Sequence, residues 1–108
     1  MTVTIYRAGD QISLILEGAL DMGKSPDIRN SLMEGLRAGK QLVVDFSRVT
    51  RIDSAIIANL VEALDSSRRR GINFVLSAVP ASVMELLRLS RLDGLFAIQD
   101  APCAEITA

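Results

Sequence analysis

The chain contains 108 residues, of which 49% are hydrophobic, and its 12 Lys and Arg residues nearly balance 13 Asp and Glu residues, giving a formal net charge of −1. This length fits one domain with one core, and so small a net charge gives no general attraction to nucleic acid or to an anionic membrane surface. The chain has no His, which excludes imidazole-based catalysis and His-rich metal sites, and its only Cys, Cys103, excludes an internal disulfide. Because no apolar run has membrane-spanning length and residues 1–10 lack a signal-peptide pattern, we expect a cytoplasmic, non-enzymatic domain without direct membrane insertion.

The start of the chain predicts a pair of antiparallel strands. Polar and apolar residues alternate over residues 2–6 and again over residues 12–16, as they do in half-buried strands. Gly9 and Asp10, between the two segments, have the composition of a hairpin turn. Within the second strand, Ile15 is expected to face the opposite side of the sheet from its even-numbered neighbours.

A helix and then a buried strand are predicted next. The Ser-Pro-Asp segment at residues 25–27 is typical of a helix start, with the Ser25 hydroxyl as N-cap, and Gly39 marks the end of the helix. Residues 41–46 are β-branched and apolar, which favours a central strand buried on both faces. Residues 47–50 are expected to form a loop.

The second half of the chain continues the alternation of helix and strand. A helix begins near residues 53–54 and ends before Gly71, which suits a left-handed C-terminal position. Residues 72–77 predict a buried strand, Pro80 starts a third helix, and residues 95–98 supply a last short strand. The apolar stripe of the helix that begins near residues 53–54 consists of Ile56, Ile57, Leu60, Val61 and Leu64. The apolar face of the third helix consists of Val83, Leu86, Leu87 and Leu89.

This order of elements predicts an α/β (α+β) fold in a single domain. The domain spans residues 1–99 and contains a mixed sheet of four to five strands with helices packed against it. Residues 100–108 are expected to form a loose C-terminal tail.

The segment between the central strand and the following helix carries the candidate site. It places Asp53 and Ser54 where free backbone N–H groups and the helix dipole favour negative charge. The hydroxyl of Ser54 is able to cap this helix, which is the commoner use of Ser at such a position. Alternatively, a phosphate on Ser54 would be tolerated by the helix but would repel a partner that presents an acidic or apolar surface.

Several segments, taken in order, resemble the STAS family of anti-sigma factor antagonists. The Asp-Phe-Ser-Arg-Val and Ile-Asp-Ser segments resemble the family signature, and the earlier Leu-Glu-Gly-Ala-Leu-Asp segment is similar to the family's Gly-x-Leu-Asp turn after the second strand. Later segments are similar to the family's later strand, third helix and closing turn. In chain order the matching segments are 16–21, 45–49, 52–54, 71–76, 83–87 and 92–96.

The resemblance implies a cytoplasmic partner-switching regulator. In that scheme the unmodified domain binds an anti-sigma factor that is also a serine kinase of the histidine-kinase-like ATPase fold. Phosphorylation of Ser54 ends the complex, and a metal-dependent serine phosphatase restores it. ATP and Mg²⁺ would belong to the kinase, so no cofactor, metal ligand or catalytic residue is expected in this chain. The expected partner-binding residues are Asp21, Met22, Asp53, Ser54, Ala55 and Ile56.

One departure from the family pattern leaves an alternative open. Antagonists of this family follow Asp-Ser with Ser or Thr and then Gly-Leu-Gly, whereas residues 55–58 here are Ala-Ile-Ile-Ala. The alternative is a constitutive subunit of a signalling scaffold or of an ABC-type lipid transporter, in which Ser54 only caps a helix. The sequence is compatible with a monomer or a weak dimer.

Overall fold

The chain opens with the antiparallel hairpin that the alternation predicts. The computed structural model describes residues 3–100, and in it β1 (Val3–Ala8) pairs with β2 (Gln11–Leu20). The turn at residues 9–10 joins them, and Gly9 adopts a φ of +61°, a left-handed conformation that glycine accepts without steric cost. The predicted hairpin is therefore confirmed.

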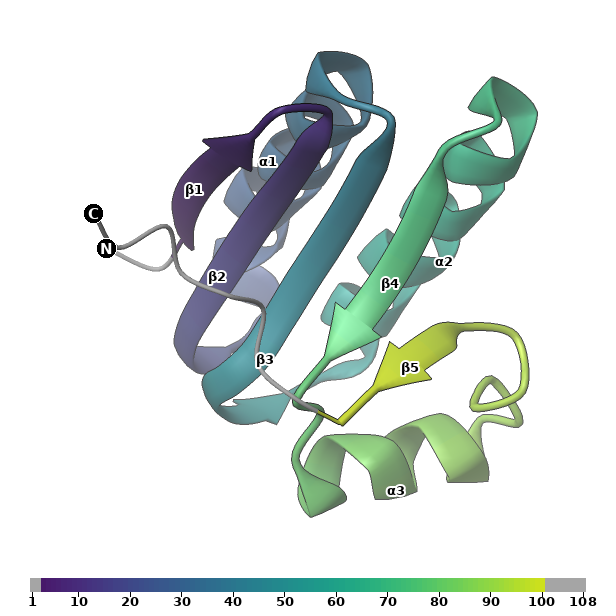
Figure 1. Ribbon diagram of the computed structural model, residues 1–108. Coiled ribbons are helices and arrows are strands. Elements are labelled where there is room, and N and C mark those ends of the chain that lie inside the picture. Colours follow the sequence, from purple (N-terminus) through teal and green to yellow (C-terminus); the bar gives the residue numbers. More distant parts are fainter. Residues whose placement is uncertain (1–2, 101–108) are drawn as a thin grey trace.

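Three further strands extend the sheet in chain order. They are β3 (Gln41–Ile52), β4 (Asn73–Ser77) and β5 (Ala97–Gln99), and each is parallel to the strand before it. Parallel neighbours need a crossover, and helices supply the crossovers in this chain. The result is a mixed five-stranded sheet of order β1-β2-β3-β4-β5, which confirms the predicted fold class (Figure 1).

The helices bury one face of this sheet. Helices α1 (Ser25–Ala38) and α2 (Ser54–Arg70) lie next to each other behind the sheet, and α3 (Ala81–Leu89) lies near β5 (Figure 1). A short 3-10 turn, η1 (Met22–Lys24), joins β2 to α1. The largest fully buried side chains between helices and sheet are Ile12, Leu14, Leu16, Leu20, Ile28, Leu32, Leu36, Leu42, Phe46, Ile56 and Leu60.

A second, smaller cluster lies on the opposite face of the sheet. Ile15 and Val43 are each only 2% exposed there, and the half-buried Tyr6 and Val75 pack against them. Ile15 thus faces away from the main core, as the alternation predicts. Residues 42–46 of the central strand β3 are buried on both faces, also as predicted, whereas most of the rest of the strand is exposed.

Strands β2 and β3 are longer than predicted, and this difference shapes the candidate site. Residues 47–50, predicted as a loop, belong to β3, and residues 17–20, which lie beyond the predicted second strand where the resemblance implies a turn, belong to β2. Their backbones pair in parallel as far as Leu20 opposite Ile52, across two register shifts. The pairing of β3 with β4 ends at Asp45. The ends of β2 and β3 therefore project past β4 as a two-stranded extension.

The start of α1 also differs from the prediction. Ser25 is the first residue of the helix and not its N-cap; Lys24 occupies the N-cap position without a side-chain cap hydrogen bond. The Ser25 hydroxyl instead accepts a hydrogen bond from Asn59 Nδ2 at 2.9 Å. The prediction was wrong because η1, which Asp21 caps, leads the chain into the helix.

The third helix presents one predicted core residue to solvent. Val83 and Leu87 are buried, whereas Leu89 is 77% exposed. At about 3.6 residues per turn, Leu89 is rotated by roughly 120° from Val83 around the helix axis and so leaves the buried face. Of the predicted loose tail over residues 100–108, all but Asp100 lies outside the described residues. Within residues 3–100, no helix has both the length and the apolarity needed to cross a membrane.

Candidate functional site

The paired ends of β2 and β3 deliver two aspartates to the same edge of the sheet. Asp21 follows Leu20 and Asp53 follows Ile52, and those two preceding residues are register partners. The two aspartates share nearly the same extended backbone, with φ and ψ of −116° and −177° for Asp21 and −117° and −176° for Asp53. Neighbouring strands are about 4.8 Å apart, so two carboxylates leave the sheet close together.

Each aspartate caps the element that follows it. Asp21 Oδ1 accepts a hydrogen bond from the backbone N–H of Gly23 at 3.0 Å. Asp53 Oδ1 accepts from the N–H groups of Ala55 at 3.0 Å and Ile56 at 3.3 Å. These bonds fix the first turn of η1 and the first turn of α2.

The cap of α2 is therefore Asp53, and the capping role that the sequence offers to Ser54 is wrong. An N-cap residue has an extended backbone and its carbonyl accepts the first bonds of the helix. Asp53 meets both conditions, because its carbonyl accepts from the N–H of Ile57 at 3.2 Å. Ser54 is already the first helical residue, and its side chain is exposed.

This assignment predicts unequal stability effects for substitutions at the two neighbouring positions. Asp53→Ala removes two cap hydrogen bonds and is expected to lower the free energy of unfolding by about 1 kcal/mol. Ser54→Ala leaves the cap in place and is expected to change it by less than about 0.5 kcal/mol. Urea denaturation of both variants checks this, and an equal loss in the two variants would contradict the assignment of the cap.

The other expected partner-binding residues differ in their accessibility. Met22 projects from η1 and is 72% exposed, and Ala55 is half-buried. Ile56 is 0% exposed and belongs to the main core, so the expectation that its side chain meets a partner is wrong. Ile57, which is 8% exposed, also packs in the core. The two isoleucines that stand in place of the family's glycine-rich segment therefore have their side chains in the core and not on the surface.

Two further residues of α2 lie beside Ser54 on the exposed face. Ala58 is exposed and Val61 is 38% exposed, and the three residues follow the i, i+4, i+7 spacing of a single helix face. Val61 was predicted to lie in the core. Helical spacing shows that Ser54, Ala58 and Val61 form one row along α2. Only the packing of α2 on its neighbours decides whether this row faces solvent or the core.

An ion pair links the exposed sides of α1 and α2. Arg29 Nη2 lies 2.6 Å from Glu62 Oε1, and Arg29 Nε donates to both oxygens of that carboxylate at 3.1 Å. The hydrogen bond from Arg29 lowers the pKa of Glu62 below its ordinary value, and the same bond raises the pKa of Arg29. Both side chains are nearly half exposed, so water screens the pair and its contribution to stability is small.

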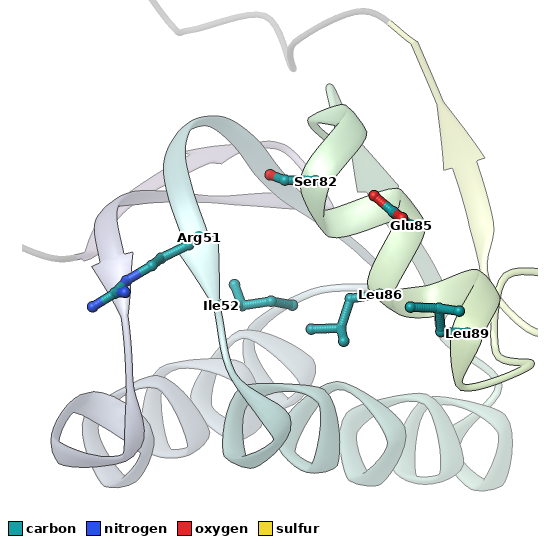
Figure 2. Close-up of a pocket in the computed structure, with 6 residues that line it drawn as sticks. All are labelled: Arg51, Ile52, Ser82, Glu85, Leu86 and Leu89. Atoms are coloured by element: carbon teal, nitrogen blue, oxygen red, sulfur yellow. The ribbon is translucent and has the colours of Figure 1, made fainter.

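A small cavity borders the site on the side of α3. Its volume is about 280 Å³, and it lies between the end of β3 and α3. In Figure 2, Leu86 points from α3 toward Ile52, Leu89 lies farther along the helix, and Arg51 points away. The cavity is lined by Arg51, Ile52, Ser82, Glu85, Leu86 and Leu89. Within residues 3–100, no group of three His, Cys, Asp or Glu side chains is placed to hold a metal ion.

Comparisons with known proteins identify the family. The family model described as "Mlab, STAS domain" matches residues 3–99. Protein TM1081 of Thermotoga maritima shares 23% sequence identity with a TM-score of 0.84, over 92% of this chain and 86% of that chain. The unphosphorylated form of the Bacillus anti-sigma factor antagonist SpoIIAA shares 15% identity with a TM-score of 0.76, over 89% and 86% of the two chains.

The same fold occurs in a protein of another kind. The sulfate transporter family protein from Wolinella succinogenes shares 18% identity with a TM-score of 0.75, over 88% of this chain and 82% of that chain. At these identities the structural likeness shows the fold, and the family model assigns nearly the whole described chain. The chain belongs to the STAS domain family.

Proposed function

We propose that this STAS domain is a cytoplasmic partner-switching regulator. In its unmodified form it binds an anti-sigma factor that is also a serine kinase of the histidine-kinase-like ATPase fold. Phosphorylation of Ser54 ends that binding, and a serine phosphatase restores it. The observation that carries the proposal is the exposed Ser54 at the first position of α2, where Asp53 already supplies the cap.

The helix start favours a phosphate at this position on electrostatic grounds. The positive end of the helix dipole stabilises an adjacent anion by about 0.3 to 1 kcal/mol. Because Ser54 is exposed, a phosphoryl group attached to it needs no rearrangement of the core. The free hydroxyl and the phosphorylated side chain are therefore both compatible with the same fold.

A phosphate on Ser54 would add negative charge to a surface that already carries two carboxylates. The carboxylates of Asp21 and Asp53 already cap the two neighbouring elements. A phosphate adds a charge of about −1.5 to −2 at neutral pH. A partner that fits two carboxylates beside an apolar Met22 meets a much more negative surface after modification.

The proposed docking surface consists of two adjoining parts. The η1 part contributes Asp21 and Met22, and the α2 part contributes Asp53, Ser54 and Ala55. The exposed row on α2 extends the second part, and Ile56 is left out because it lies in the core. The surface thus combines an apolar projection with a charged helix start.

A protein of similar structure, SpoIIAA, supports the proposal. SpoIIAA is described as an anti-sigma factor antagonist and has been solved in an unphosphorylated and a phosphorylated form. The proposal gives this chain the same two features, the activity of an anti-sigma factor antagonist and an unphosphorylated and a phosphorylated form. ATP and Mg²⁺ would be bound by the kinase.

Mass spectrometry tests the modification directly. Serine kinases of the histidine-kinase-like ATPase fold from the same organism are purified and incubated with the full chain, ATP and Mg²⁺. One phosphoryl group is expected at Ser54, none in Ser54→Ala, and one in Ser82→Ala, which removes another exposed serine near a helix start. Modification that persists in Ser54→Ala, or its absence with every kinase, would overturn the proposal.

A second candidate function is a constitutive subunit of a signalling scaffold or of an ABC-type lipid transporter. Residues 55–58 favour it, because they lack the Ser/Thr-Gly-Leu-Gly pattern of the antagonists. Under this function, binding to the assembly does not depend on the charge at Ser54. The effect of an acidic residue at that position separates the two functions.

A further inference from the structure

A buried amide joins α2 to the segment that carries Met22. Asn59 is 5% exposed, and its Nδ2 donates to the backbone oxygen and to the hydroxyl of Ser25, both at 2.9 Å. Asn is a weak helix former, and a buried amide is costly unless it is hydrogen-bonded. An apolar side chain would serve both the helix and the core better, so the hydrogen bonds to Ser25 are the physical reason for an amide here.

The contact matters because α1 has no side-chain cap of its own. Lys24, at the N-cap position, directs its Nζ back to the carbonyl of Ala19 in β2 at 2.7 Å. The backbone N–H of Ser25 donates to the carbonyl of Met22, which closes η1 onto the helix. The last residue of η1, Lys24, is thus attached to β2 through its side chain, and the residue that follows η1, Ser25, is attached to α2 through Asn59.

We infer that Asn59 is a positioning residue that holds η1 in a fixed place relative to the first turns of α2. Five residues beyond Ser54 along α2, it lies in the interior and does not contact a docked partner. Through Ser25 it fixes Met22 and Asp21 with respect to Ser54. The two parts of the proposed docking surface then move as one body.

The consequence for binding rests on the proposed function. A surface that is already ordered loses less conformational entropy when a partner docks. Removing the amide frees η1 while leaving the docking side chains unchanged. Affinity for a partner that spans both parts is expected to fall about tenfold.

Amide hydrogen exchange on the free protein tests the coupling without any partner. The Gly23 N–H donates to the Asp21 side chain and the Lys24 N–H donates to the Asp21 carbonyl at 3.0 Å, so both amides report on the closure of η1. In Asn59→Ala their exchange is expected to accelerate at least tenfold more than that of core amides in β3. Exchange of the core amides reports any loss of global stability, so the comparison with them isolates the effect on η1.

A matched control removes a different buried polar group from the same helix. Ser67 is 1% exposed, and its hydroxyl donates to the carbonyl of Leu64 at 2.6 Å. In Ser67→Ala, exchange in η1 and in the core is expected to change in parallel. Ser25→Ala keeps the backbone acceptor of Asn59 and removes the hydroxyl acceptor, so its effect on η1 is expected to be intermediate.

Parallel exchange of η1 and core amides in Asn59→Ala, as in the control, would overturn the positioning role. If Asn59→Ala does not fold, Ser25→Ala decides the question by the same comparison. The measurement involves neither kinase nor phosphate. Failure of phosphorylation at Ser54 therefore rejects the proposed function alone, and failure of the exchange result rejects the role of Asn59 alone.

Discussion

Under the proposed function, Ser54→Asp is expected to weaken binding of the anti-sigma factor about 100-fold or more, because a partner that presents an acidic or apolar surface to Ser54 leaves the new carboxylate repelled or desolvated without a counter-charge, at a cost of several kcal/mol. The substitution places a third carboxylate beside Asp21 and Asp53 at the docking surface. The fold is expected to remain intact, since Ser54 is exposed and an acidic residue is favourable at the first turn of a helix. Isothermal titration calorimetry with the purified partner measures the loss, and circular dichroism checks the fold.

Ser54→Asn is the matched control for this prediction. Its side chain has almost the shape of Asp without the charge, so binding is expected to stay within about threefold of the unmodified protein. A comparable loss in both variants would point to steric disruption and contradict an electrostatic switch. Full binding by a well-folded Ser54→Asp would support the constitutive subunit.

Phe46→Ala is expected to lower the free energy of unfolding by about 3 to 5 kcal/mol, as deletion of a large buried aromatic side chain does. Phe46 is 0% exposed and lies one residue beyond the last β3–β4 pair, at Asp45. Its ring packs on the helix-facing side of the sheet at the base of the two-stranded extension. Domains of this size have a total stability of roughly 5 to 15 kcal/mol, so the variant is expected to be partly unfolded at physiological temperature.

Urea denaturation followed by circular dichroism measures this loss. Leu89→Ala removes another large apolar side chain, but Leu89 is 77% exposed, so a change below about 0.5 kcal/mol is expected. A loss below about 1 kcal/mol for Phe46→Ala would mean that the core closes around the missing ring and does not depend on it.

Features with local signals could be predicted from the sequence. The hairpin follows from alternation around Gly9, and the end of α2 follows from Gly71, which has the expected left-handed φ of +68°. The order of strands and helices gave the mixed sheet. The Asp53-Ser54 pair was found because charged and hydroxyl residues at a helix start are distinctive.

Features that depend on partners distant in sequence could not be predicted. The end of β3 carries exposed polar residues such as Ser47 and Arg48 and so has the composition of a loop, yet pairing with β2, opposite Glu17, makes it a strand. The hydrogen bond from Asn59 to Ser25 spans 34 residues and leaves no local pattern.

The sequence could not decide whether Asp53 or Ser54 caps α2, for a different reason. Both side chains are favourable N-caps, and the composition of the segment does not distinguish them. Only the backbone decides, because β3 pairs with β2 as far as Ile52 and leaves Asp53 extended. The helix then begins one residue later than a serine cap would require.

Because Asp53 secures the start of α2, the identity of residue 54 carries almost no folding cost. Descendants of one ancestral gene are thus free to exchange Ser54 for a threonine, an alanine or an acidic residue through single-codon changes. Under the proposed function, versions that respond to the kinase, versions that always bind the partner and versions that never bind it would share one scaffold. Duplicated copies within a genome are able to diverge in signalling behaviour long before their architecture does.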